Sequence, residues 1–292
     1  KKRLDRKYTM YFGKGKWEGS VYAFYQDFLA AQAARGREVT PPGNSFDVYD
    51  LAALAYLYKR IKENDPVREA SHVVIDEAQD FGMMAYQVLH YCLRDCTYTI
   101  MGDTSQNIHF SYGLNDWEEL KKLILTGTYD AFGVLRKSYR NTVEIASYAA
   151  NLIGVTDLEL FERHGMPVLE RDVTDLEAAL REAVDTLFPD EKTYETAAVI
   201  VPDEKTAERA YLILREILAE KDFDCEKRLS WLNRDSSSFK KGLTVTTFYL
   251  AKGLEFDQVF SIFPKDEKRE MMMQAQYIAA TRALHELRVY HI

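Results

Sequence analysis

Acidic side chains stand directly after a short apolar run. The run is His72 to Ile75, which predicts a buried parallel strand, and Asp76 and Glu77 follow it. An aspartate at the end of a buried strand can hold the hydrated magnesium of a nucleoside triphosphate, because Mg²⁺ keeps most of its waters and needs only one or two carboxylates. The neighbouring glutamate can orient and deprotonate the attacking water. The simpler interpretation is an ordinary strand end with surface acids, since an apolar run before Asp-Glu is common.

A glutamine follows the next apolar run in a similar position. Residues 98–101 form this run, Gly102 and Asp103 end it, and Gln106 comes shortly afterwards. Ligands of open α/β sheets sit at the carboxyl ends of the strands. A glutamine there can hydrogen-bond a γ-phosphate or the water that attacks it.

Basic side chains and a second pair of acids, Glu255 and Asp257, lie in the other half of the chain. Arg140 precedes an expected helix, Arg282 lies near the end of another, and Gly253 and Glu255 stand in a turn after a strand. Arginine can stabilise the charge of a phosphate in transfer. The simpler interpretations are ion pairs: Arg140 with Glu144, and Arg282 with Glu286 at helical spacing.

Strands that alternate with helices must position these groups, and this alternation is typical of a parallel α/β sheet. It occurs twice, separated by the polar stretch 126–130, which predicts two α/β domains over residues 1–130 and 131–292, the first incomplete at its N-terminus. Helix 50–61 is apolar almost all round, so we expect it to be well buried. The expected strands are 72–75, 98–101, 133–135, 197–201, 243–248, 258–263 and 287–290, and the expected helices are 20–34, 50–61, 83–93, 116–125, 142–153, 175–187, 203–220 and 267–284.

Composition narrows the class of protein. The chain has 292 residues and a net charge of −8, which excludes a globally basic nucleic-acid coat but not a local basic groove. The three cysteines cannot form a disulfide framework, and no Cys/His spacing suggests zinc. There is no signal peptide and no apolar run of the roughly 20 residues that span a bilayer, so we expect a cytoplasmic protein without a membrane contact. The charged start at Lys1 indicates a piece of a longer chain.

Taken in order, these segments resemble motifs II to VI of the UvrD/Rep-like superfamily 1 helicases. The resemblance implies two RecA-like domains and ATP-driven movement along single-stranded nucleic acid. The segments that carry it are residues 73–80, 102–106, 135–141, 247–257 and 277–283.

A finer resemblance is to the HelD, or DNA helicase IV-like, branch of this family. It covers nearly the whole chain and is carried by residues 49–54, 137–142 and 280–285. In Gram-positive bacteria that branch includes an ATP-dependent factor that releases RNA polymerase from stalled complexes. The resemblance therefore implies RNA polymerase as a partner, besides single-stranded DNA, and we expect a monomer.

The resemblance also assigns roles. Asp76 would bind Mg²⁺, Glu77 would be the general base, and Gln106 would sense the γ-phosphate of ATP. Arg140 and Arg282 would act as arginine fingers from the second domain. Glu255 would hold the ribose, with Gly253 allowing close approach of the backbone.

The chain departs from the family pattern in two respects. No GxxxxGK[ST] is present, so the phosphate-binding loop would lie upstream of Lys1 or be lost, and we expect this fragment alone to be inactive. His109 and Ser111 stand where relatives carry stacking aromatics, with Phe110 and Tyr112 alongside, and Tyr249 stands where relatives often have a histidine. Loss of stacking platforms, each worth about 1–3 kcal/mol, predicts weak gripping of single strands.

The sequence is also compatible with other functions. A conventional DNA helicase in repair is the first alternative, and a degenerate motor used as a nucleotide-gated binding module is the second. A nuclease–helicase subunit would need a nuclease domain after the last motif. The basic residues of segment 222–241 indicate either a contact surface or, more simply, a solvated loop, and the aromatic residues near the start indicate either a surface or a core.

Overall fold

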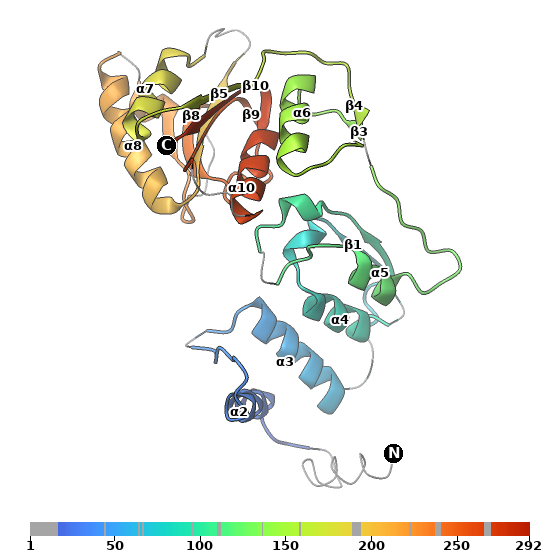
Figure 1. Ribbon diagram of the computed structural model, residues 1–292. Helices are drawn as coiled ribbons and strands as arrows, with labels where there is room; N and C mark the ends of the chain where they lie inside the picture. Colours follow the sequence, from blue (N-terminus) through green and yellow to red (C-terminus); the bar gives the residue numbers. More distant parts are fainter. Residues whose placement is uncertain are drawn as a thin grey trace. The chain divides into compact units, whose positions relative to one another are not determined.

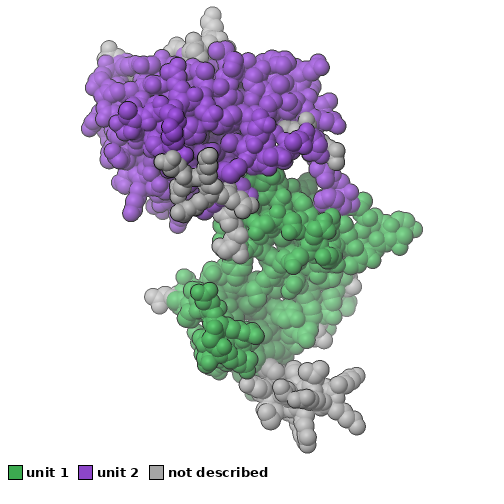
Figure 2. Space-filling view, viewed as in Figure 1, with its two compact units in different colours: residues 1–131 green, residues 132–292 purple. Residues whose placement is uncertain are grey.

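The computed structural model describes residues 17–43, 45–63, 65, 67–94, 96–109, 112–135, 137–157, 159–188, 194–221, 224–236, 241–265 and 270–292. The chain forms two compact units, residues 1–131 and 132–292, which Figure 2 shows in different colours. Each unit has its own buried apolar clusters.

Two helices pack together at the start of unit 1. Helix α2 (Val21–Ala33) begins at Ser20, whose hydroxyl accepts a hydrogen bond from the N–H of Ala23. Helix α3 (Val48–Ile61) begins with a capping box between Asp47 and Asp50. The Tyr25 hydroxyl donates to the buried Asp50 at 2.8 Å and so ties the two helices together.

The expectation that the second of these helices is buried almost all round is wrong. Only Asp50, Ala53 and Leu54 of α3 are buried, whereas Leu51 and Tyr58 are about half exposed. Helix α3 meets α2 and α4, and Leu57 and Tyr56 are partly buried there, but the apolar side chains outside these contacts face solvent.

The sheet of unit 1 has two parallel strands in the part that the structure describes. Strand β1 (His72–Ile75) pairs with β2 (Thr97–Ile100), and helices α4 (Met83–Cys92) and α5 (Glu118–Ile124) pack on one face of the pair. The other face is uncovered among these residues, so Val74 is 61% exposed. Both predicted strands are confirmed, but the predicted burial of the first is wrong because helices cover only one of its faces. Short 3-10 turns follow each strand, η1 (Ala78–Asp80) and η2 (Thr104–Gln106).

Unit 2 contains a six-stranded parallel sheet, which confirms the α/β class. Its strand order is β5-β10-β9-β6-β8-β7, and every pairing is parallel. The central strand β6 registers with β8 from Thr196↔Gly242 to Val201↔Thr247. The strands are β5 (Leu169–Asp172), β6 (Thr196–Val201), β7 (Leu229–Trp231), β8 (Gly242–Thr247), β9 (Phe256–Phe263) and β10 (Ala283–His291).

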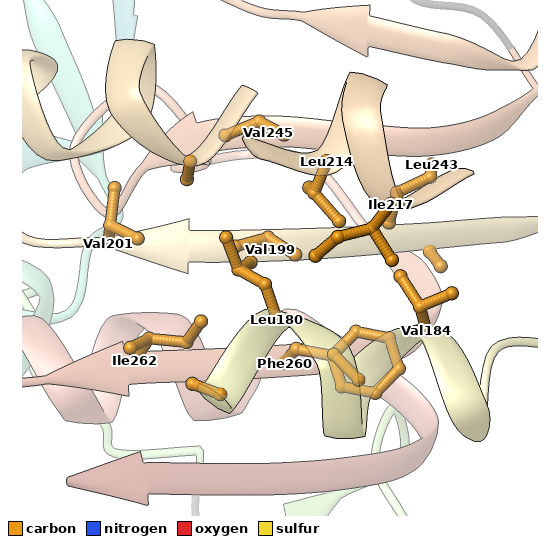
Figure 3. Close-up of a cluster of buried hydrophobic side chains, with 14 of the residues drawn as sticks. Leu180, Val184, Val199, Val201, Leu214, Ile217, Leu243, Val245, Phe260 and Ile262 are labelled. Atoms are coloured by element: carbon orange, nitrogen blue, oxygen red, sulfur yellow. The ribbon is translucent and has the colours of Figure 1, made fainter. Parts of the chain in front are cut away.

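Helices cover both faces of this sheet (Figure 1). Helices α7 (Leu176–Asp185) and α8 (Glu204–Ala219) bury one face, and Figure 3 shows the leucine, valine and isoleucine side chains that fill the space beneath them. Helices α6 (Val143–Leu152) and α10 (Glu270–Thr281) bury the other. Thr142, Asp175 and Asp203 cap three of these helices through side-chain oxygens that accept backbone N–H groups.

Three predicted elements of unit 2 differ in the structure. Residues 133–135 are exposed and form no strand; the short pair β3 (Lys137–Ser138) and β4 (Glu159–Leu160) follows instead. The expected loop 222–241 contains α9 (Cys225–Arg228) and β7, because Leu229 is buried against the sheet. The last helix ends at Thr281 rather than at residue 284, and β10 begins at Ala283. None of the described helices is long and apolar enough to cross a membrane.

Candidate active site

The candidate acids of unit 1 lie where β1 ends. Asp76 and Glu77 are both exposed, and the Asp76 carboxylate accepts the N–H of Glu77 at 2.8 Å. Glu77 has a φ of +50°, in the left-handed region that non-glycine residues seldom adopt. Such backbone strain is typical of functional positions, and here it turns the chain sharply at the carboxyl edge of the sheet.

A buried glutamine joins the two predicted motifs of this unit. Gln79 is fully buried, and its amide nitrogen donates to the Glu77 carboxylate at 2.5 Å. Its amide oxygen accepts the backbone N–H of Asp103 at 2.9 Å. The Asp103 carboxylate in turn accepts the side-chain amide of Gln106 at 2.9 Å. The structure therefore brings Glu77 and Gln106 into one hydrogen-bonded chain.

The bridging role of Gln79 was not predicted from the sequence. The signal for it is its place two residues after Glu77, in a turn where an amide can reach both strand ends. Gly102 leaves room for it, because a Cβ there would overlap the Gln79 amide oxygen and the backbone of Ala78.

The nucleic-acid candidates of unit 1 form an aromatic stack. The rings of His109 and Tyr112 lie 4.8 Å apart, and the Tyr112 hydroxyl meets Nδ1 of His109 at 2.6 Å. Tyr112 also contacts the ring of Tyr49 edge-on, with centroids 4.4 Å apart. Burial, followed by the interaction with Tyr112, raises the pKa of Tyr49. Phe110 lies outside the described residues.

Three of the predicted residues of unit 2 converge at the amino edge of its sheet. Nε of Arg140 and the Glu255 carboxylate form an ion pair at 2.7 Å, with 46% and 42% of the two side chains exposed. Glu255 directly precedes β9. Arg282 directly precedes β10, and one of its guanidinium nitrogens lies 3.4 Å from the carbonyl oxygen of Leu254.

The backbone next to Arg140 is tied to the same edge. The side-chain amide of Asn141 donates to the carbonyls of Thr281 at 3.2 Å and Ala283 at 2.6 Å. This buried amide therefore connects the start of α6 with the end of α10.

The two arginines differ in their exposure. Arg282 is 1% exposed, and it donates to the carbonyl of Ile278 at 3.2 Å and to the hydroxyl of Thr281 at 3.1 Å. Arg140 is open to solvent along half of its side chain. Arg140 is thus accessible to solvent, whereas Arg282 is buried and donates to Ile278 and Thr281 of unit 2.

The acids considered as simpler partners of these arginines have other contacts. Glu144 accepts from His164 and from the N–H of Gly165, each at 2.9 Å. Glu286 pairs with Arg288 at 2.7 Å.

Tyr249 and Gly253 occupy the connection from β8 to β9. Tyr249 follows the carboxyl end of β8 and packs edge-on against Phe248. Gly253 has a φ of +79° and open space where a Cβ would stand. Because β9 begins at the opposite edge of the parallel sheet, Tyr249 is not brought to the cluster that contains Glu255.

The acids at the end of β1 fit a hydrated magnesium ion. Among the described residues no group of three or more His, Cys, Asp or Glu side chains could enclose a metal. Mg²⁺ needs only one or two protein carboxylates when phosphate oxygens and waters supply the rest, and the exposed carboxylate of Asp76 is such a ligand.

Comparisons with known proteins gave matches only among solved structures. No protein-family model and no curated protein matches the chain. The C-terminal domain of a possible DNA helicase from Lactobacillus plantarum WCFS1 is 24% identical, with a TM-score of 0.41 over 53% of this chain and 88% of that domain.

Two viral helicases match over a longer part of the chain. The PRRSV helicase is 15% identical with a TM-score of 0.42, and Arterivirus nonstructural protein 10, a helicase in complex with DNA, is 14% identical with a TM-score of 0.38. Each covers 92% of this chain, which spans 45% and 52% of the two helicases. Since all three TM-scores lie below 0.5, the assignment of the fold rests on the sheet topology.

Proposed function

We propose that the chain is part of an ATP-dependent superfamily 1 helicase or translocase motor. The observation that carries this proposal is the convergence of Arg140, Glu255 and Arg282 at one edge of the six-stranded sheet. These residues are far apart in the sequence, and the family resemblance assigns the two arginines to the γ-phosphate and Glu255 to the ribose of the same nucleotide. An ordinary surface ion pair would not gather the residues of three separate motifs.

The geometry of unit 1 supports ATP hydrolysis. Asp76 would hold Mg²⁺ through its exposed carboxylate, and Glu77 would orient and deprotonate the attacking water. The amide of Gln79 donates to Glu77 and so fixes the direction of that carboxylate. Gln106 would sense the γ-phosphate, because the same hydrogen-bonded chain holds it beside Asp103. When bound, ATP supplies the phosphoanhydride whose hydrolysis drives movement.

The arginines of unit 2 would supply positive charge to the bound nucleotide. Arg140 would stabilise the phosphate charge of the transition state, a contribution of about 10³–10⁵ in rate for arginine fingers. Arg282 would reach a phosphate only after its guanidinium leaves Ile278, Thr281 and Leu254, so its role as a second finger requires a rearrangement. Glu255 would hold the ribose when it exchanges its contact with Arg140 for one with the sugar.

We further propose that the motor is of the HelD type and acts on RNA polymerase complexes. The supporting features are the segments 49–54, 137–142 and 280–285, the net charge of −8, and the absence of the usual stacking pair at His109 and Ser111. An acidic protein with few stacking platforms is poorly suited to hold single-stranded DNA tightly.

The test uses the full-length parent protein. ATP hydrolysis is measured alone, with single-stranded DNA and with RNA polymerase, with Glu77→Gln as the blank and Glu119→Gln, an exposed acid on α5, as the matched control. We expect Glu77→Gln to lower turnover by about 10²–10⁴-fold, the usual contribution of a general base, and Glu119→Gln to leave it unchanged.

The partner that stimulates ATP hydrolysis distinguishes the HelD-type role from a conventional helicase. Stimulation by RNA polymerase with little effect of DNA supports the HelD-type role. Stimulation by DNA alone would overturn that role and leave a conventional helicase. Turnover no higher than the Glu77→Gln blank under every condition would overturn the motor and favour a nucleotide-gated binding module.

A further inference from the structure

One charged side chain outside the predicted motifs bridges two of them. Arg163 lies between β4 and β5, and one of its terminal nitrogens donates to the backbone carbonyl of Arg140 at 3.1 Å. The other donates to the carbonyl of Leu284 at 2.8 Å and to Nδ1 of His285 at 2.8 Å. Its own carbonyl accepts the N–H of Val143 at 2.9 Å.

These contacts decide the protonation of His285. A guanidinium only donates hydrogen bonds, so Nδ1 of His285 must accept, and the ring proton of a neutral imidazole is then on Nε2. Nε2 lies 3.6 Å from the Asp257 carboxylate. Burial, and next the positive charge of Arg163, lower the pKa of His285 and so favour its neutral form.

Asp257, at the far end of this series of side-chain contacts, is anchored to the sheet. The Asp257 carboxylate accepts the backbone N–H groups of Glu195 and Thr196 at 2.8 and 2.9 Å, at the amino end of β6. The ring of His285 stacks on that of Tyr194, with centroids 5.7 Å apart. The contacts of Arg163 therefore run through His285 and Asp257 to the amino end of β6, and Arg163 connects the carbonyl of Arg140 to this part of the sheet.

We propose that Arg163 is a positioning residue for the phosphate-binding Arg140. Its planar fork fixes the backbone at Arg140 against the start of β10. The Arg140 side chain then leaves that fixed point to meet Glu255. Lysine cannot replace Arg163, because a single ammonium does not reproduce the geometry of the two divergent donors of a guanidinium. This inference rests on the proposed function, since it assumes that Arg140 acts on a phosphate.

The test is a double-mutant cycle in the full-length parent protein. ATP turnover is measured for Arg163→Ala, Arg163→Lys, Arg140→Ala and the pair Arg140→Ala/Arg163→Ala. We expect both Arg163 variants to lower kcat by about 10–100-fold, the effect of a misplacement of about 1 Å, while KM for ATP changes less. In the Arg140→Ala background the second substitution should have no further effect, because Arg163 acts through Arg140.

The controls separate positioning from general stability. Arg171→Ala removes an exposed arginine of β5 that pairs with Glu182, and it should leave kcat unchanged. Thermal melting identifies any variant that does not fold. Independently of any Arg163 variant, ¹⁵N NMR of the wild-type protein, with His285 assigned through His285→Gln, should show Nδ1 unprotonated and Nε2 protonated at neutral pH.

Failure of the inference and failure of the proposed function have different signatures. An unchanged kcat in folded Arg163→Lys, a further loss of kcat in the Arg140→Ala background, or a proton on Nδ1 of His285 would each overturn the positioning role. A parent protein in which Arg140→Ala and Glu77→Gln leave turnover unchanged, or which has no turnover, would overturn the proposed function and the inference with it.

Discussion

At the scale of single residues, hydrogen bonds from buried amides direct the charged groups of both units. Gln79 orients Glu77 in unit 1, and Asn141 fixes the segment after Arg140 in unit 2. Buried amides of this kind cannot be removed without leaving backbone groups unsatisfied, which costs about 1–3 kcal/mol for each group. The charged side chains themselves are exposed to solvent, except for that of Arg282.

The sequence predicts the positions of these charged residues better than their surroundings. Acids after an apolar run must stand at a strand end, and the structure places Asp76 and Glu77 there. Whether an arginine near a helix end is exposed depends on what packs over it, so the burial of Arg282 was not predictable from its spacing. The bridging role of Arg163 was equally unpredictable from the sequence, because its partners come from distant segments of the chain.

A carboxylate in unit 2 should make stability depend on pH. The hydrogen bond from His164, and next that from the N–H of Gly165, lower the pKa of Glu144 to about 2. Because the folded pKa lies below the ordinary value of 4.5, the stabilisation is fully present above pH 4.5 and is lost as the pH falls towards 2. The difference in unfolding free energy between wild type and Glu144→Gln, measured by urea unfolding, should therefore shrink across this window.

An exposed glutamate of α8 provides the control for this measurement. Glu208→Gln is measured alongside, to correct for the general loss of stability in acid. A wild-type minus Glu144→Gln difference that stays constant across the window would contradict the assignment of the low pKa to Glu144.

At the scale of elements, the strands and helices that could be predicted are those whose apolar runs are long enough to show a pattern. β6 lies at the centre of the sheet, so its residues are apolar on both faces and its run was recognisable. Strands β3, β4 and β7 were missed because each spans only two or three residues, too few for a periodic pattern. Strand β5 was also missed, because its residues are exposed and mostly charged and so form no apolar run.

Gly242 should be essential for the pairing of β7 with β8. Its φ is +119°, and a Cβ there would overlap the carbonyl oxygen of Arg228. We expect Gly242→Ala to lower the unfolding free energy of unit 2 by about 2–4 kcal/mol, because backbone strain adds to a clash with backbone atoms.

Gly154 is the matched control for this substitution. It also has a positive φ, +68°, but open space at the Cβ position, so Gly154→Ala should cost only about 1–2 kcal/mol. Urea unfolding followed by circular dichroism compares the two variants. Equal losses would contradict the role assigned to the close contact at Arg228.

At the scale of the whole molecule, the two units differ in the size of their cores. Among the described residues, the buried apolar clusters of unit 2 have 20 and 15 members, whereas those of unit 1 have five and four. Since apolar burial is the main source of stability, unit 2 should be the more stable of the two.

Denaturation of the 292-residue chain should accordingly show two transitions, with unit 1 unfolding first. Tryptophan fluorescence can report each unit separately, because Trp17 and Trp117 lie in unit 1 and Trp231 lies in unit 2. Trp231→Phe leaves the signal of unit 1, and the double variant Trp17→Phe/Trp117→Phe leaves that of unit 2. Coincident midpoints in these two variants would contradict the independence of the units.

The two-stranded sheet of unit 1 should make this chain prone to self-association at high concentration. Within the described residues, β1 and β2 pair only with each other, so each strand has an outer edge that no other described strand occupies. Such an edge is a template for strand addition, and the apolar Val74 on the uncovered face favours it further. Self-association of this chain should therefore begin at β1, where a charged side chain in place of Val74 would oppose it.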